Sequence, residues 1–220
     1  LYVERPLFER FVNALKNGAE NMKIGAPFEA GVAMGPMISQ EQRDKVLSYY
    51  KKAVAEGATV VTGGGIPTMP AEFNKDAWVQ PTIWTGLPEA ASILRDEIFG
   101  PCCHITPFDT EEEVLALAND TTYGLSATLW TSNLSRAHRM AGALEAGIVW
   151  VNSWFLRDLR TAFGGMKQSG IGREGAHEGL KEFLETKDPK TFYPAHFYGR
   201  IKEFIHIERL ANLEKLPNYG

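Results

Sequence analysis

Apolar residues along this chain recur at helical spacing in some segments and form short unbroken runs in others. Residues 6–22 follow the helical spacing, with a proline tolerated in the first turn, and this pattern predicts an amphipathic helix. A second helix is expected over residues 39–56, because Ser39 and Gln42 form a capping-box pattern and Gly57 follows the end. Most of the expected strands come after these two helices.

Short apolar runs between turn signals predict the strands. Residues 58–61 read as a short buried strand, and residues 79–85 read as a further strand region. From there the expected strands are residues 102–108, 126–130 and 148–151, and the helices between them are residues 111–119 and 133–146. Strands that alternate with helices pair in parallel through right-handed crossovers. The expected fold class is therefore α/β, a mostly parallel open sheet with helices on both faces.

One main domain followed by a tail is the expected organisation. A chain of 220 residues with 44% apolar content can bury one sizeable core or two small ones. The alternating pattern occupies residues 1–187, whereas residues 188–220 hold three prolines, scattered aromatic residues and one short helical candidate at 200–216. The chain begins with leucine inside an apparent strand, so we expect its start to be a cut.

Charge and cysteine content narrow the classes of function. The net charge of -4 gives no basic surplus for nucleic acid or anionic lipid. No apolar run approaches the roughly 20 residues of a membrane span, and no signal-peptide pattern is present. The adjacent Cys102 and Cys103 are poorly arranged for a disulfide, and the histidines lack metal-site spacing. A cytoplasmic protein without a metal centre is expected.

The loop after the last predicted strand is the first candidate site. Arg157 and Arg160 share it with Trp154 and Phe163, so cations that can fork onto a carboxylate lie beside apolar walls. This combination suits an anionic organic molecule. Surface pairing of both arginines with Asp158 or neighbouring acids is the simpler alternative, and the spacing alone favours it.

A second candidate is the segment DEIFGP between two strand regions. An exposed carboxylate at Glu97 could accept two hydroxyl protons from a sugar, while the ring of Phe99 packs against a flat heterocycle. That chemistry is suited to a nucleoside. Locally, a salt bridge from Glu97 to Arg95 and a core position for Phe99 are the simpler alternatives.

Three further patterns are poor indicators of chemistry. GxGxxG at residues 170–175 matches a dinucleotide fingerprint, but no apolar strand directly precedes it. The glycines at 63–65 precede prolines rather than the helix that a phosphate site needs. Cys102 and His104 share one strand face, but no third residue orients them, so a buried cysteine is the better interpretation.

Four segments together resemble the NAD(P)-dependent aldehyde dehydrogenase superfamily. They are EIFGP at 97–101, NDTTYGLSA at 119–127, GIVWVN at 147–152 and FGGMKQSGIGREG at 163–175. Their order and spacing match that family from residue 1 to about residue 187. The finer signature NSWFLRDLRTAFGG is similar to the branch that oxidises 2-hydroxymuconate or 2-aminomuconate semialdehyde.

The resemblance implies roles for individual residues. Glu97 would bind the nicotinamide-ribose hydroxyls of NAD, and Phe99 would flank the nicotinamide ring. Arg157 would hold the carboxylate of the semialdehyde, and Glu174 matches a family glutamate proposed to take part in proton relay. The remaining expected pocket residues are Trp154, Phe163 and, as a weaker candidate, Arg160.

Several residues that the family's mechanism requires are expected to lie outside this sequence. A cysteine thiolate attacks the aldehyde, a hydride passes to NAD+, and water hydrolyses the resulting thioester. By the resemblance, the nucleophile, the Rossmann domain, the general-base glutamate and the oxyanion-hole asparagine precede the strand that Leu1 begins. Cys102 and Cys103 do not replace that nucleophile. We therefore expect the chain alone to be inactive.

Besides a simple nucleotide-binding module, which would bind NAD by itself, two interpretations of this chain stay open at this point. The first is the catalytic-domain portion of a semialdehyde dehydrogenase, which needs the missing N-terminal half or a homo-oligomer. The second is a non-catalytic remnant or split-gene partner that folds and binds another chain. The family usually closes with a short pairing strand soon after the position of Lys187, whereas this chain continues with DPKTFYPAHFYGR, so dimerisation by that strand is in doubt.

Overall fold

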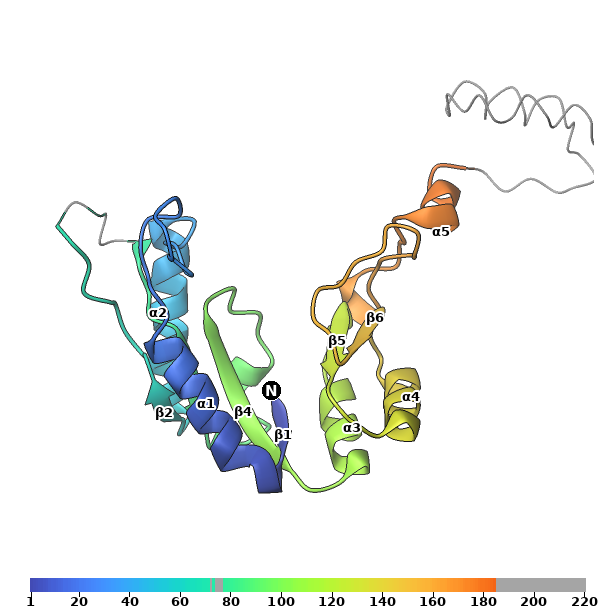
Figure 1. The fold of residues 1–220 in the computed structure, drawn as a ribbon, viewed down its shortest axis with the longest axis horizontal. Coiled ribbons are helices and arrows are strands. Elements are labelled where there is room, and N and C mark those ends of the chain that lie inside the picture. Colours follow the sequence, from blue (N-terminus) through green and yellow to red (C-terminus); the bar gives the residue numbers. More distant parts are fainter. Residues whose placement is uncertain (72, 74–76, 185–220) are drawn as a thin grey trace, which may run out of the picture.

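The computed structural model describes residues 1–71, 73 and 77–184, and its helices and strands are labelled in Figure 1. The helices are α1 (Phe8–Glu20), α2 (Gln40–Ala55), α3 (Glu111–Asn119), α4 (Leu134–Ala143) and α5 (Ala176–Lys181). The strands are β1 (Tyr2–Glu4), β2 (Thr59–Thr62), β3 (Thr82–Thr85), β4 (Cys102–Phe108), β5 (Ser126–Leu129) and β6 (Ile148–Val151). Short 3-10 turns cover Arg5–Leu7, Ser92–Leu94 and Lys167–Ser169. The expected tail at residues 188–220 lies outside the described residues.

The described strands form two sheets. The larger has the order β1-β4-β3-β2, with β4 parallel to both β1 and β3 and with β2 antiparallel to β3. The smaller consists of β5 and β6, which are parallel. Figure 1 shows the two sheets in separate arms of a U, joined by the segment between β4 and α3. The predicted α/β class with mostly parallel pairing is confirmed.

Helices α1 and α2 cover opposite faces of the larger sheet. Ile83 and Trp84 are neighbours in β3, so their side chains point to opposite faces. Ile83 packs in a core cluster with Val12 of α1, whereas Trp84 packs with Tyr50 of α2 at 5.4 Å between ring centroids. Burying each of these side chains contributes roughly 1.5–3 kcal/mol. The predicted placement of helices on both faces therefore holds for this sheet.

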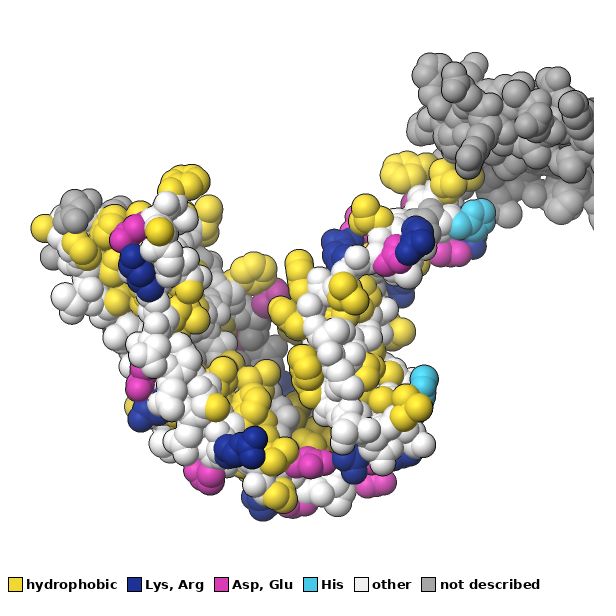
Figure 2. Space-filling view, viewed as in Figure 1, with side chains coloured by type: hydrophobic (Ala, Val, Ile, Leu, Met, Phe, Trp, Pro, Cys, Tyr) yellow, Lys and Arg dark blue, Asp and Glu magenta, His cyan; other side chains and the backbone are white. Residues whose placement is uncertain are grey.

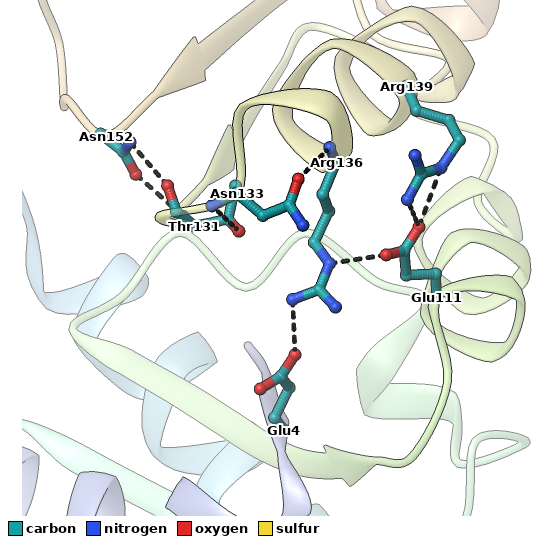
Figure 3. A network of polar contacts seen from close by, with 7 residues as sticks. All are labelled: Glu4, Glu111, Thr131, Asn133, Arg136, Arg139 and Asn152. Carbon is teal, nitrogen blue, oxygen red and sulfur yellow. Dashed lines mark hydrogen bonds and ion pairs between the residues drawn. The ribbon is translucent and has the colours of Figure 1, made fainter.

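A charged network joins the two arms (Figure 3). Arg136 of α4 lies 3.1 Å from Glu4, at the end of β1, and 2.6 Å from Glu111, at the start of α3. Arg139 shares the same Glu111 carboxylate at 2.5 Å. Because Glu4 belongs to the larger sheet and both arginines belong to the other arm, the network links elements more than 100 residues apart in sequence.

Two predicted elements need correction. The strand expected to be buried at residues 58–61 is β2, an edge strand in which Thr59 and Val60 are exposed, because it pairs with β3 alone. The helix expected to reach residue 146 ends at Ala143, because Leu144 has extended backbone angles. The N–H of Glu145 then bonds to the Asn119 side chain at 2.9 Å instead of continuing the helix.

Candidate functional site

The loop that carries Glu97 and Phe99 is held in place by the first turns of α2. Phe99 has a φ of 57°, a left-handed conformation that is uncommon for a bulky residue. The Gln42 amide donates hydrogen bonds to the carbonyls of Ile98 and Phe99, at 3.2 and 2.8 Å. Lys45 donates to the Glu97 carbonyl at 3.3 Å. These contacts stabilise a backbone shape that the loop sequence does not favour by itself.

The same contacts explain why the predicted capping box is only half formed. Ser39 accepts the N–H of Gln42 at 3.2 Å, as the pattern predicts. The Gln42 side chain, however, points away from Ser39, because its NH2 group donates to the carbonyls of the neighbouring loop. The second half of the expected box therefore positions the candidate site instead of capping the helix.

Both side chains of the DEIFGP candidate are exposed. The Phe99 ring is 70% exposed, so it is not the core residue that the simpler alternative expects. Arg95 pairs with Asp120 at 2.6 Å. Glu97 and Phe99 line a cavity of about 690 Å³ between β1, β4 and the end of α3, and Glu97 also borders a neighbouring cavity of about 490 Å³. An exposed carboxylate beside an exposed ring at a cavity wall fits the ribose and ring end of a dinucleotide.

The loop after β6 begins at a second strained residue. Asn152 has a φ of 50°, and its amide makes two reciprocal hydrogen bonds with the backbone of Thr131, at 2.9 and 2.8 Å (Figure 3). Thr131 follows β5, so this pair joins the carboxyl ends of both strands of the smaller sheet. The loop that contains the arginines therefore leaves the sheet from a fixed point.

Aromatic side chains shape the first part of that loop. Trp150 is buried in β6, and its indole N–H donates to the Leu156 carbonyl at 2.8 Å, which folds the loop back onto the strand. Trp154 and Phe155 lie 5.5 and 6.2 Å from the Trp150 ring, and both are about two-thirds exposed. Figure 2 shows further apolar side chains along the inner walls of the hollow between the two arms.

The structure treats the two arginines of the loop differently. The Arg157 guanidinium lies 4.2 Å above the centre of the Phe163 ring and 3.7 Å from the Glu174 carboxylate. Arg160 instead pairs with Asp158 through three side-chain hydrogen bonds of 2.9, 3.2 and 2.7 Å, the surface pairing that the simpler alternative expects. Arg157, Phe163 and Glu174 therefore form one cluster, and Arg160 lies outside it.

The two halves of the candidate site border adjacent cavities. Glu97 lines the 490 Å³ cavity, whereas Phe163 and Glu174 line one of about 800 Å³. Leu125 and Ser169 belong to the walls of both. The two cavities thus share part of a wall, whereas Arg157 itself is not among the residues that line either of them.

Polar residues that sequence reasoning did not single out hold these walls together. The Lys167 ammonium donates to the carbonyls of Asn119 and Thr121, and it pairs with Glu145 at 2.6 Å. Ser169 accepts the N–H of Gly124 at 2.9 Å. All of these residues except Glu145 lie in two of the four segments singled out in the sequence, 119–127 and 163–175. Their long-range partners, however, cannot be read from local spacing.

Cys102, Cys103 and His104 are poorly suited to nucleophilic chemistry. Burial raises the pKa of Cys102 to about 12 and also raises that of Cys103, so both favour the thiol. Burial lowers the pKa of His104 to about 4, with a smaller contribution from the nearby terminal ammonium. The ring accepts the N–H of Leu87 at 3.1 Å. These three side chains therefore contribute to packing within the larger sheet and do not act as nucleophiles or bases.

Within residues 1–71, 73 and 77–184, no three His, Cys, Asp or Glu side chains gather as metal ligands would. In the same ranges, none of the helices combines the length and apolar character needed to span a bilayer.

The chain resembles known proteins over most of its length. Residues 1–188 match the model of the Aldehyde dehydrogenase family. A 2-hydroxymuconic semialdehyde dehydrogenase of Pseudomonas sp. (strain CF600) is 66% identical over 188 residues, which are 86% of this chain and 39% of that protein. A 2-aminomuconic 6-semialdehyde dehydrogenase of Pseudomonas sp. is 55% identical over 185 residues, or 84% of this chain and 38% of that protein.

Solved structures agree with the sequence relatives. The NAD+ complex of an aldehyde dehydrogenase from Bacillus cereus superposes with a TM-score of 0.80 at 41% identity, covering 84% of this chain and 37% of the other. The chain therefore spans about two-fifths of the length of the curated relatives that it matches.

Proposed function

The chain belongs to the aldehyde dehydrogenase family, and we propose that it forms the substrate-binding part of an enzyme that oxidises a semialdehyde to the acid. The proposed substrate carries a carboxylate, in the class of 2-hydroxymuconate or 2-aminomuconate 6-semialdehyde. Relatives at 66% and 55% identity bear the names of those two substrates. The activity proposed here is that of a whole enzyme, of which this chain supplies one wall of the site.

The observation that carries the proposal is the state of the Arg157 guanidinium. It is stacked on Phe163 and 42% exposed, and among the described residues its side chain makes no hydrogen bond. A planar guanidinium with free N–H donors binds a carboxylate through two parallel hydrogen bonds. Trp154, which is exposed on the same loop, is the proposed apolar wall for the carbon chain of the substrate.

The proposed cofactor is NAD, which accepts the hydride when it is bound. Glu97 and Phe99 are the residues of this chain that would hold its nicotinamide-ribose end, because an exposed carboxylate and an exposed ring lie together at a cavity wall. Gln42 would keep both in position through the loop backbone. In this role the residues of the chain bind and orient the cofactor.

We further propose that the chain does not turn over aldehyde by itself. The raised pKa of Cys102 and Cys103 leaves neither as a ready thiolate near neutral pH. The proposed partner is a polypeptide that corresponds to the remainder of the relatives, or another copy of an assembled enzyme. The rival proposal is a non-catalytic remnant that binds another chain, and co-purification with a Rossmann-type polypeptide would favour the split enzyme over it.

A chimera tests the proposed function. This chain replaces the matching 188 residues of the Pseudomonas 2-hydroxymuconic semialdehyde dehydrogenase, and NADH formation is followed. Arg157→Ala should raise KM for the carboxylate-bearing semialdehyde by about 10-fold or more, because a charged hydrogen bond is lost. KM for a neutral aldehyde should change little.

Two arginine controls make the result specific. Arg10 is exposed on α1, so Arg10→Ala should leave both KM values unchanged. Arg160→Ala should raise KM less than Arg157→Ala does, because Asp158 already occupies that guanidinium. Equal effects of Arg157→Ala on the charged and the neutral aldehyde would refute the carboxylate-binding role.

A further inference from the structure

The Glu174 carboxylate lies where an anionic ligand of Arg157 would be expected. Its Oε1 is 3.7 Å from the Arg157 guanidinium, closer than solvent-separated charges but too long for a hydrogen bond. The Glu174 side chain is 71% exposed, whereas that of Arg157 is 42% exposed. The pair is therefore an ion contact that leaves the donors of the guanidinium unused.

The backbone fixes this arrangement independently of the Glu174 side chain. Phe163 and Glu174 form an antiparallel pair in which each N–H donates to the carbonyl of the other, at 2.8 Å in both directions. Residues directly opposite in such a pair project to the same side. The Phe163 ring and the Glu174 carboxylate thus flank the Arg157 guanidinium together.

Tight backbone contacts support the same pair. A Cβ at Gly164 would lie 2.3 Å from the Gly172 carbonyl oxygen, so the two segments that carry Phe163 and Glu174 meet at a distance only glycine allows. Loss of the Glu174 charge should therefore leave the path of the chain unchanged.

We propose that Glu174 is the resident counter-ion of Arg157, which an incoming carboxylate must displace, and that it thereby lowers the affinity of the site for carboxylate ligands. This inference rests on the carboxylate-binding role proposed for Arg157. The ligand carboxylate can accept two parallel N–H donors, a geometry that Glu174 does not reach. Glu174 can swing into water when displaced, because most of its side chain is already solvated.

The Arg157–Glu174 pair also explains why an uncharged ligand should gain no affinity from Arg157. A neutral aldehyde offers nothing that replaces Glu174, so the guanidinium stays paired and gains nothing from the ligand. When a carboxylate ligand binds, Arg157 exchanges its long contact with Glu174 for two parallel hydrogen bonds to the ligand. Glu174 therefore weakens the binding of every anion, and most of all the binding of anions that cannot accept two parallel hydrogen bonds. The family resemblance suggests proton relay for the same residue, which concerns turnover rather than ligand binding.

The test uses the 220-residue chain and adipate, a six-carbon dicarboxylate, with 1,6-hexanediol as the neutral probe. Calorimetry and tryptophan fluorescence report binding, since Trp154 lies exposed on the same loop. Glu174→Gln should lower the Kd for adipate by about 3- to 10-fold at low ionic strength, and the gain should shrink in high salt because exposed charges are screened. Glu174→Ala should act in the same direction.

A matched control lies nearby on α5. Glu178 pairs with Lys181 at 2.8 Å, so Glu178→Gln changes the net charge equally without touching Arg157 and should leave the Kd within about 2-fold. Hexanediol binding should be the same in every variant.

The possible outcomes separate the two proposals. If Glu174→Gln binds adipate as weakly as the unmodified chain or more weakly, while Arg157→Ala abolishes binding, the counter-ion role is wrong and the Arg157 role stands. If Arg157→Ala leaves adipate binding unchanged, or if the unmodified chain binds no adipate, both proposals are wrong. Tighter binding by Glu178→Gln as well would reduce the effect to net charge and would also overturn the counter-ion role.

Discussion

Replacing Gly100 by alanine should destabilise the fold, because this glycine closes the candidate cofactor loop directly against α2. A Cβ at Gly100 would lie 2.7 and 2.8 Å from the two γ carbons of Val46. Val46 is fully buried within α2. A β-branched side chain has one strongly preferred rotamer in a helix, so rotation cannot relieve the contact. Either the loop or the helix must therefore move.

The cost follows from the overlap. Carbon atoms in favourable contact are about 3.5 Å apart or more, so the new Cβ requires a shift of roughly 0.8 Å. Overpacking of this kind costs about 1–3 kcal/mol. The backbone angles of Gly100 are open to alanine, and the restricted unfolded state returns about 0.4–1 kcal/mol. A net loss of about 0.5–2 kcal/mol should lower the thermal midpoint by roughly 2–6 °C for a chain of this size.

Thermal unfolding followed by circular dichroism measures this loss, with Gly142→Ala as the control. Gly142 lies in α4, and a Cβ there would meet nothing within 4 Å. Alanine is favoured over glycine in a helix by about 1 kcal/mol, so the control should be neutral or more stable. Val46→Ala combined with Gly100→Ala should cost less than the sum of the two single changes. A Gly100→Ala chain as stable as the original would refute the close approach.

Two further predictions concern stability. The ring of His104 accepts a backbone N–H, and its pKa is lowered by burial to about 4 from 6.5, so the unfolded state binds a proton that the folded state excludes. The stability that His104 contributes should be complete above about pH 6.5 and lost as the pH falls towards 4. Urea unfolding at each pH measures the free energy of unfolding, which should fall less steeply with decreasing pH in His104→Gln than in the original chain. The same fall in both proteins would contradict the prediction. Glu111→Gln removes the shared partner of Arg136 and Arg139, so it should lower the thermal midpoint modestly, and by less in high salt. Glu112→Gln, the control, should leave the midpoint unchanged. Equal shifts of the midpoint in both variants would argue against the network.

Local signals predicted the order and type of most elements. Thr110 accepts the N–H of Glu113 at 3.1 Å, and the Glu113 side chain accepts the Thr110 N–H, so the predicted helix at residues 111–119 begins with a complete capping box. Such caps depend on residues three apart, and the hydrophobic period depends on one turn or one pleat. The parallel pairing of β5 with β6 followed from the helix between them. These features need no knowledge of distant contacts.

The rest depended on partners far away in sequence. The spacing of Ser39 and Gln42 predicted a reciprocal cap, but the Gln42 amide binds a loop more than 50 residues later. The exposure of Phe99 depends on that same contact, since its left-handed backbone turns the ring away from the core. Spacing placed both arginines with local acids, whereas Arg157 contacts Glu174, which a backbone pair brings beside Phe163. Sequence separation, rather than residue type, limited these predictions.

Polar side chains whose hydrogen bonds are already made have a structural role in this chain, whereas those with unused donors are the candidates for ligand binding. Asn119 uses its amide to accept the N–H of Glu145 and to donate to the Ala143 carbonyl, and Lys167 is likewise committed to fixed acceptors. Groups with their bonds already made hold the loops and have little left for a ligand. Within the part of the chain that the structure describes, the Arg157 side chain makes no hydrogen bond, and its ion pair with Glu174 is a long, mostly solvated contact. Segments 119–127 and 163–175 therefore supply mainly a scaffold, and binding chemistry is to be sought at the few exposed charges that this scaffold positions but does not satisfy.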